Sequence, residues 1–140
     1  MKKTIFWDYN GTIIDDTLYC LSIENEMLEN RGLPGPVTLE EYLDHFGFPV
    51  INYYYKIGYT FEDETYEDVS VEFNRKYDEN FDRVSLMDDF TEFIQKASEQ
   101  GYQNVIVSAS RQDKLEAQCE KLGIRQYFTE DRRASWRERV

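Results

Sequence analysis

Residues 6–16 read FWDYNGTIIDD, in which an apolar run ends abruptly in an acid and a glycine turn follows. The run from Thr4 to Trp7 is typical of a short buried strand, so Asp8 is expected at the carboxyl end of that strand. Open α/β sheets hold their ligand sites at this end of their strands. Asp8 is therefore the first candidate for a functional residue, and the amide of Asn10 two places later needs an explanation.

A second stretch, residues 101–108, repeats this arrangement, with a β-branched run that ends in the hydroxyl of Ser108. Between the two runs, residues 17–84 show apolar spacing that predicts helices, and one more helix is expected on each side of the second run. Strand, helix, strand and helix in this order predict a parallel sheet. We therefore expect an α/β fold in which a Rossmann-like core carries an inserted helical segment.

Six helices are expected from the apolar spacing and from the capping residues. They cover residues 17–30, 38–46, 49–57, 63–77, 88–100 and 113–122. Leu18 is expected on an apolar stripe of the first helix. Thr38 opens the second helix with a capping-box pattern, and Leu39 and Leu43 share an apolar face of that helix.

The bulk composition narrows the class of protein. The 140 residues are 41% apolar and carry a formal net charge of -12. Such an apolar fraction supports a packed core, whereas the negative charge disfavours nucleic acid, whose phosphates bind clustered Lys and Arg. The apolar run after Lys3 is too short for a signal peptide or a membrane span. With Cys20 and Cys119 expected as reduced, buried thiols, we predict a cytoplasmic protein that binds neither nucleic acid nor membrane.

The chemistry that these residues support is phosphoryl transfer. A carboxylate at a strand end can attack phosphorus and form an aspartyl phosphate. Because carboxylate and phosphate repel each other, a divalent cation is required, and Mg²⁺ prefers few carboxylates together with water. Gly11 and Thr12 are expected to direct backbone N–H groups of the turn toward the phosphate. The hydroxyl of Ser108 and the N–H of Ala109 are expected to donate further hydrogen bonds.

Two stretches of the chain resemble motifs of the haloacid dehalogenase (HAD) superfamily. Residues 8–16, DYNGTIIDD, resemble the first motif, Asp-x-Asp-Gly-Thr followed by an apolar pair. Residues 105–108, VIVS, resemble the second motif, an apolar strand that ends in Ser or Thr. The run from Ser108 to Phe128 is similar to phosphoglycolate-phosphatase-like members, and the resemblance as a whole covers residues 3–129.

The resemblance implies a HAD-type core formed by residues 1–16 and 85–130, with residues 17–84 as a small helical cap. Residues 131–140 are rich in Arg and lack an apolar pattern that would continue the sheet. This tail is either a natural basic extension or a sign that the chain is cut or altered after about Thr129. We expect the tail to be disordered or foreign to the fold, and the core to be incomplete at its C-terminus.

The resemblance also implies the roles of individual residues. Asp8 would be the nucleophile and a metal ligand, the backbone carbonyl of Asn10 would be a second ligand, and Ser108 would hold the transferred phosphoryl group. Hydrolysis of a small phosphorylated metabolite with Mg²⁺ is the activity that these roles imply.

Asn10 departs from the family pattern, because the family has a second Asp there that protonates the leaving oxygen and then activates water. An amide can do neither, and general acid–base catalysis contributes about 10²- to 10⁴-fold. The family's third and fourth motifs, a Lys or Arg and an acidic pair, are not found in the sequence either. We therefore expect a phosphatase that is slow or inactive as the chain stands.

A non-catalytic module is the alternative. An incomplete core would bind metal or phosphate weakly and would leave a sheet edge uncovered, which favours a homodimer or a domain-swapped oligomer. A phosphoacceptor receiver domain also uses an acid at a strand end, but the long helical insertion at residues 17–84 counts against it.

Overall fold

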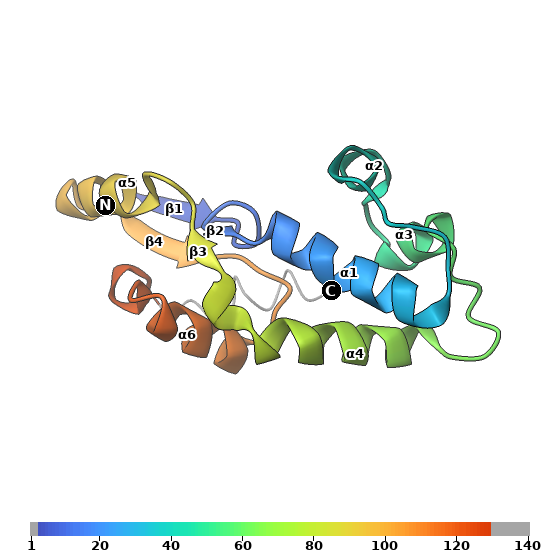
Figure 1. The fold of residues 1–140 in the computed structure, drawn as a ribbon. Helices are drawn as coiled ribbons and strands as arrows, with labels where there is room; N and C mark the ends of the chain where they lie inside the picture. Colours follow the sequence, from blue (N-terminus) through green and yellow to red (C-terminus); the bar gives the residue numbers. More distant parts are fainter. Residues whose placement is uncertain (1–2, 130–140) are drawn as a thin grey trace. The chain divides into compact units, whose positions relative to one another are not determined.

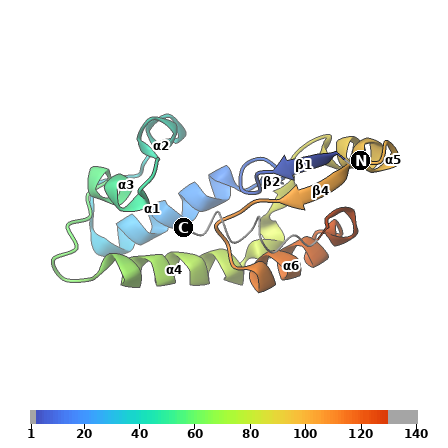
Figure 2. The same ribbon diagram turned by 180° about the vertical axis from the view of Figure 1, so that it is seen from behind.

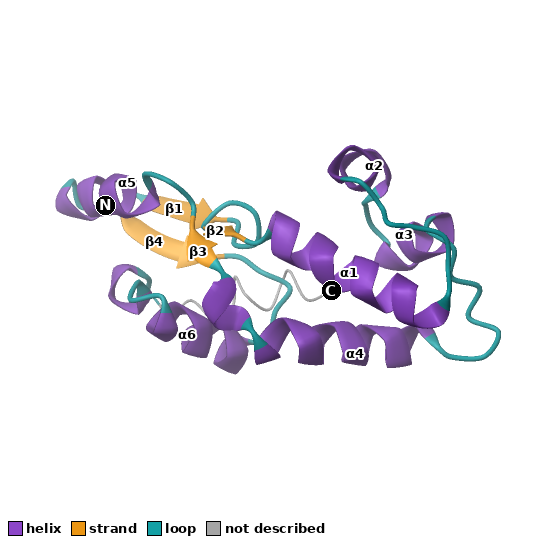
Figure 3. Cartoon of the chain, in the orientation of Figure 1, coloured by secondary structure: helices purple, strands orange, loops and turns teal. Residues whose placement is uncertain are grey.

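The computed structural model of the protein describes residues 3–129, so the predictions for the tail at 131–140 and for Glu130 lie outside the described residues. The chain divides into two compact units (Figure 1). One unit contains the chain up to Asp16 together with the chain from Val84 onward, and the other spans Thr17–Arg83. All strands of the described chain lie in the first unit, and the second is helical (Figure 3).

A parallel pair of strands forms the centre of the first unit. Strand β1 (Thr4–Trp7) pairs with β4 (Gln103–Ile106), and Trp7 lies opposite Ile106 in the register. The pairing continues one step further, because the N–H of Val107 donates to the carbonyl oxygen of Trp7 at 2.8 Å. The predicted α/β class with a parallel core is confirmed, and the carboxyl ends of both strands lie at one edge of the sheet.

Two helices flank this strand pair. Helix α5 (Phe90–Glu99) leads into β4 and packs on it, and α6 (Gln112–Lys121) follows β4 (Figure 2). Trp7 anchors β1 in this packing, because its ring meets Phe90 edge-on at 5.2 Å between ring centroids. The indole N–H of Trp7 also donates to the side-chain oxygen of Asn104, a residue with only 1% of its surface exposed.

The first unit also contains a small antiparallel sheet that the sequence did not predict. Strand β2 (Ile14–Asp15) pairs with β3 (Ser85–Leu86), and the N–H of Met87 donates to the carbonyl oxygen of Ile13 at 2.9 Å. Strands of two residues are too short to produce a recognisable alternation of apolar and polar residues. This sheet joins the turn after β1 to the segment in which the chain returns to the first unit.

Four α-helices and a short 3-10 turn form the second unit. They are α1 (Thr17–Arg31), α2 (Leu39–His45), α3 (Val50–Lys56), α4 (Tyr66–Glu79) and the turn Phe81–Arg83. Helices α1 and α4 lie side by side in both views (Figures 1 and 2). The hydroxyl of Thr38 accepts a hydrogen bond from the N–H of Glu41, as the capping pattern predicts.

The structure adds three details that the apolar spacing and capping pattern of the helices did not give. Helix α4 begins after Thr65, which forms a capping box with Asp68, rather than at residue 63. Leu18 is 64% exposed, although it shares the spacing of the buried leucines in α1. Helix α2 buries none of its residues, and its apolar face at Leu39 and Leu43 is exposed. Helical spacing identifies an apolar face but does not specify what covers it.

Candidate functional site

Asp8 directly follows β1 and lies at the carboxyl edge of the strand pair, where the sequence predicts it. Its side chain is exposed. The hydroxyl of Thr12 donates to the Oδ2 atom of Asp8 at 3.1 Å, and no hydrogen bond from the described residues reaches Oδ1. Thr12 therefore orients the carboxylate and leaves one of its oxygens accessible.

The turn behind Asp8 is held by its own backbone. The carbonyl oxygen of Tyr9 accepts hydrogen bonds from the N–H groups of Thr12, Ile13 and Ile14 at 2.9–3.3 Å. Gly11 has a φ of +75°, a conformation that favours glycine, and its N–H donates to the carbonyl oxygen of Ile14 at 3.0 Å. The turn is consequently a closed, hydrogen-bonded structure.

This geometry corrects one prediction. Gly11 and Thr12 were expected to direct backbone N–H groups of the turn toward a phosphate, but their own N–H groups donate within the turn. A four-residue turn closes by satisfying its own N–H groups, and the sequence does not indicate which of them are used in this way. The contribution of Thr12 comes instead from its side chain, through the hydrogen bond to Asp8.

Tyr9 fixes the turn to the rest of the first unit. Its side chain is fully buried, and its hydroxyl donates to the Oε1 atom of Gln118 in α6 at 2.9 Å. Burial is the main cause that raises the pKa of the Tyr9 phenol well above its ordinary value. The phenol is therefore a neutral hydrogen-bond donor that fixes the residue directly after Asp8 to helix α6.

The side chain of Asn10 is hydrogen-bonded to a buried acid. The Nδ2 atom of Asn10 donates to the Oδ2 atom of Asp16 at 2.9 Å, and Asp16 has only 2% of its surface exposed. The backbone carbonyl of Asn10 accepts no hydrogen bond from the described residues. The amide of Asn10 is therefore engaged. The ligand role of the carbonyl, which the family resemblance implies, stays a prediction.

Ser108 and Ala109 follow β4 at the same edge. The register of the strands places Asp8 level with Val107, so Ser108 follows within one residue. Ser108 is buried, and its Oγ atom accepts a hydrogen bond from the N–H of Ser110 at 3.1 Å. The hydroxyl proton of Ser108 is left to donate, and Ala109 is exposed.

A magnesium ion would find two oxygen donors here, the carboxylate of Asp8 and the carbonyl of Asn10. Within residues 3–129, no three His, Cys, Asp or Glu side chains gather closely enough to hold a metal ion. Mg²⁺ commonly uses one or two carboxylates and takes its remaining ligands from water and substrate phosphates. The donor set of this turn therefore fits Mg²⁺ bound together with a phosphate.

The sequence did not reveal three residues that support the site, namely Tyr9, Asp16 and Gln118. Tyr9 and Gln118 are 109 positions apart in the chain, and no local sequence pattern predicts a contact between them. Asp16 resembles an ordinary polar residue in front of a helix. Only its burial distinguishes Asp16 from such a residue, and the burial of a single position cannot be predicted from the spacing of apolar residues.

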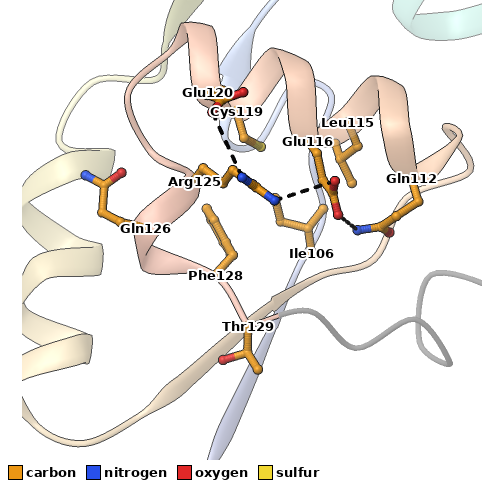
Figure 4. A pocket seen from close by; sticks show the side chains of 10 residues that line it. All are labelled: Ile106, Gln112, Leu115, Glu116, Cys119, Glu120, Arg125, Gln126, Phe128 and Thr129. Carbon is orange, nitrogen blue, oxygen red and sulfur yellow. Dashed lines mark hydrogen bonds and ion pairs between the residues drawn. The ribbon is translucent and has the colours of Figure 1, made fainter.

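A pocket of about 490 Å³ lies elsewhere in the first unit, between α6, the end of β4 and the 3-10 turn Arg125–Tyr127 (Figure 4). None of the predicted site residues lines it. Three charged residues line it, and Arg125 pairs with Glu116 at 3.6 Å and with Glu120 at 4.0 Å. Burial raises the pKa of the Cys119 thiol in its wall to about 11, so this thiol is not a nucleophile at neutral pH.

Within the described residues, no helix combines the length and apolar character needed to cross a membrane. A comparison with curated proteins found no match. A comparison with protein-family models matched residues 5–131 to the haloacid dehalogenase-like hydrolase family.

Several solved structures share the fold. A predicted phosphoglycolate phosphatase from Haemophilus somnus 129PT has a TM-score of 0.71 and 19% identity, over 91% of this chain and 60% of that one. A haloacid dehalogenase-like family protein from Streptococcus pneumoniae has a TM-score of 0.71 and 15% identity, over 91% and 59%. An Asp-to-Asn mutant of CbbY from Rhodobacter sphaeroides, in complex with xylulose-1,5-bisphosphate, has a TM-score of 0.68 and 18% identity, over 91% and 61%.

The chain thus spans about 60% of the length of these structures. The likeness at this level of identity establishes the fold, and the family model covers most of the chain. The chain belongs to the haloacid dehalogenase-like hydrolase family.

Proposed function

We propose that the protein hydrolyses a small phosphate monoester through a phosphorylated Asp8. The observation that carries this proposal is the orientation and accessibility of the Asp8 carboxylate, which directly follows β1. One of its oxygens is oriented by the hydroxyl of Thr12, and the other is accessible. An exposed carboxylate with a fixed orientation is suited to nucleophilic attack on phosphorus.

In the first step, Oδ1 of Asp8 attacks phosphorus, the bond from phosphorus to the leaving oxygen breaks, and that oxygen departs with the bonding electrons. The hydroxyl of Ser108 would donate a hydrogen bond to an oxygen of the transferred group. Asn10 has no acidic proton to give to the leaving oxygen. Substrates whose leaving group is stable as an anion should consequently react faster than simple alkyl phosphates.

In the second step, water attacks phosphorus and releases phosphate from Asp8. The amide of Asn10 can accept a hydrogen bond from this water through Oδ1 but cannot take its proton. Water activation would therefore be weak, and the phosphorylated Asp8 would persist longer than in an enzyme with an Asp at this position.

Asp8 and the carbonyl of Asn10 would hold Mg²⁺. When bound, Mg²⁺ neutralises part of the negative charge that the carboxylate and the phosphate share. The remaining ligands would come from water or from the substrate, because no three His, Cys, Asp or Glu side chains of the described residues gather closely enough to hold a metal ion.

We propose a small phosphorylated metabolite as the substrate. One of the similar structures is described as a predicted phosphoglycolate phosphatase, and another is in complex with a sugar bisphosphate. These descriptions concern those proteins, and they support only the class of a small phosphate ester here. The cytoplasm as the compartment and a homodimer or swapped oligomer as the assembly remain further proposals from the sequence.

The test is Mg²⁺-dependent release of phosphate from an aryl phosphate, compared between the wild type and Asp8→Asn. We expect release by the wild type and its loss in Asp8→Asn. Asp15→Asn is the matched control, because Asp15 is an exposed acid in the same segment to which we assign neither the attack on phosphorus nor metal binding. Equal rates for wild type and Asp8→Asn would exclude Asp8 as the nucleophile and favour the non-catalytic module.

A further inference from the structure

The side chains of Asn10 and Asp16 form a pair six residues apart in the first unit. The Nδ2 atom of Asn10 lies 2.9 Å from the Oδ2 atom of Asp16. Asp16 is 2% exposed, whereas Asn10 is exposed. The pair therefore has a buried acceptor and a donor at the surface of the turn.

The chemistry of the two groups determines the orientation of the amide. An amide has a donor nitrogen and an acceptor oxygen, and the nitrogen of the Asn10 amide is the atom that faces Asp16. The Oδ1 atom is consequently on the other side of the amide, away from the buried acid. A flipped amide would place two acceptor oxygens against each other.

We propose that Asp16 is a positioning residue for Asn10 and that the two residues form a matched donor and acceptor pair. Asp16 holds the amide so that Oδ1 of Asn10 is presented as a hydrogen-bond acceptor on the exposed side. This inference rests on the proposed function for its catalytic meaning, because the atom so presented would orient water at the phosphorylated Asp8. The pairing itself rests only on the geometry of the turn.

The pair has a consequence for the missing acid at position 10. Asn10→Asp alone would replace the donor by a second carboxylate at hydrogen-bond distance from buried Asp16, and like charges at this distance repel strongly. This single change should therefore destabilise the turn rather than restore a working acid. Asn10→Asp combined with Asp16→Asn exchanges donor and acceptor, and keeps the hydrogen bond and the net charge.

The test is a double-mutant cycle on the full 140-residue chain, with urea unfolding of the wild type, both single variants and the double variant. Residues in contact usually couple by amounts that correspond to about 2-fold to 150-fold in the unfolding equilibrium constant. We expect Asn10→Asp to raise the unfolding equilibrium constant by about tenfold. In the double variant, Asp16→Asn should reverse most of this increase. Additive effects of the two substitutions would overturn the pairing.

A matched control distinguishes the pair from a general effect of charge. Asn10→Asp combined with Asp15→Asn has the same net charge and the same composition as the exchanged pair. Asp15 is exposed and has no hydrogen bond with Asn10. We expect no rescue in this control, and a rescue equal to that of Asp16→Asn would contradict the proposal.

The catalytic meaning is tested by kcat and KM for an aryl phosphate in the presence of Mg²⁺. We expect kcat of the exchanged pair to exceed that of the wild type by at least about tenfold with KM little changed, because a proton carrier now stands at position 10. Asn10→Asp alone should give no such gain, and an equal gain would contradict the role of Asp16.

The two proposals fail in different ways. If the stabilities are coupled but none of the proteins releases phosphate, the pair is supported and the proposed function is overturned. If the wild type releases phosphate through Asp8 but the stabilities are additive, the function is supported and the pair is overturned.

Discussion

The hydroxyl of Tyr9 donates a 2.9 Å hydrogen bond to the side-chain oxygen of Gln118, and this contact fixes the turn behind Asp8 to helix α6. The same residue closes the turn through its carbonyl oxygen, which accepts from three N–H groups. Tyr9 thus closes the turn of the candidate site through its carbonyl oxygen and fixes that turn to helix α6 through its hydroxyl.

Tyr9→Phe should destabilise the protein by about 1–2 kcal/mol, because it leaves the buried oxygen of Gln118 without its donor. Urea unfolding measures this loss. Tyr127→Phe is the matched control, since the Tyr127 hydroxyl forms an exposed hydrogen bond with Gln95 and its removal should have a much smaller effect. Equal losses in both variants would show that the contact with Gln118 has no special importance.

Strand β1 shows which part of the core could be predicted from the sequence. Its observed bounds, Thr4–Trp7, agree with the predicted strand, because a short apolar run that ends in an acid is a strong local signal. The parallel partner at β4 followed from the alternation of strands and helices. Strands β2 and β3 have two residues each and depend on each other, so neither has a local signal.

The candidate site was predictable in its backbone positions and not in its side-chain contacts. Asp8 and Ser108 follow their strands as expected, since strand ends can be read from the sequence. The acceptors of the Gly11 N–H and of the Asn10 amide could not be predicted from the sequence. Hydrogen bonds within a turn depend on its three-dimensional conformation. The start of α4 at Tyr66, directly after its cap Thr65, was missed for a different reason, since the acids before it resemble a first helical turn.

Glu24 should make the stability of the second unit dependent on pH. It is buried in α1, and burial raises the pKa of its carboxyl from 4.5 to about 7. The Tyr53 hydroxyl approaches this carboxyl without meeting the geometry of a hydrogen bond, and it offsets only part of the effect. A folded-state pKa above the unfolded value means that the folded unit binds the proton more tightly.

The resulting stabilisation is complete below about pH 4.5 and is lost as the pH rises through about 7. At pH 8, Glu24→Gln should therefore be more stable than the wild type, by at most about 3 kcal/mol, and this difference should shrink toward pH 4. Urea unfolding between pH 4 and pH 8 measures it. Glu29→Gln, at an exposed position of the same helix, should show no such dependence.

Arg31 should stabilise the second unit through two carboxylates. Its guanidinium donates to both oxygens of Glu64 at 2.8 Å and to Glu72 at 2.8 Å, and it lies over the ring of Tyr59. The hydrogen bond from Arg31 is the main cause that lowers the pKa of Glu72. A planar guanidinium can serve both carboxylates at once, whereas an ammonium group cannot reproduce this geometry.

Arg31→Lys should consequently reduce the free energy of unfolding by about 1 kcal/mol, a value discounted for the partial exposure of the pair. The loss should be smaller in high salt, which screens these charges. Arg75→Lys is the matched control, because Arg75 forms a single exposed ion pair with Glu79 and should show no measurable loss. Similar losses in both variants would exclude a special role for the paired carboxylates.

A phosphorylated Asp8 should be detectable directly. Without a proton carrier at Asn10, the second step slows, so the intermediate should accumulate when the protein is mixed with an aryl phosphate and Mg²⁺. Mass spectrometry of the peptide that contains Asp8 should show one added phosphoryl group, which hydroxylamine removes because the linkage is an acyl phosphate. Asp8→Asn should give no such peptide, and Asp15→Asn should give it as in the wild type. The exchange of Asn10→Asp with Asp16→Asn should shorten the lifetime of the intermediate, since water would then have a base. Phosphorylation at another residue, or a lifetime that does not respond to this exchange, would contradict the assignment of the two steps.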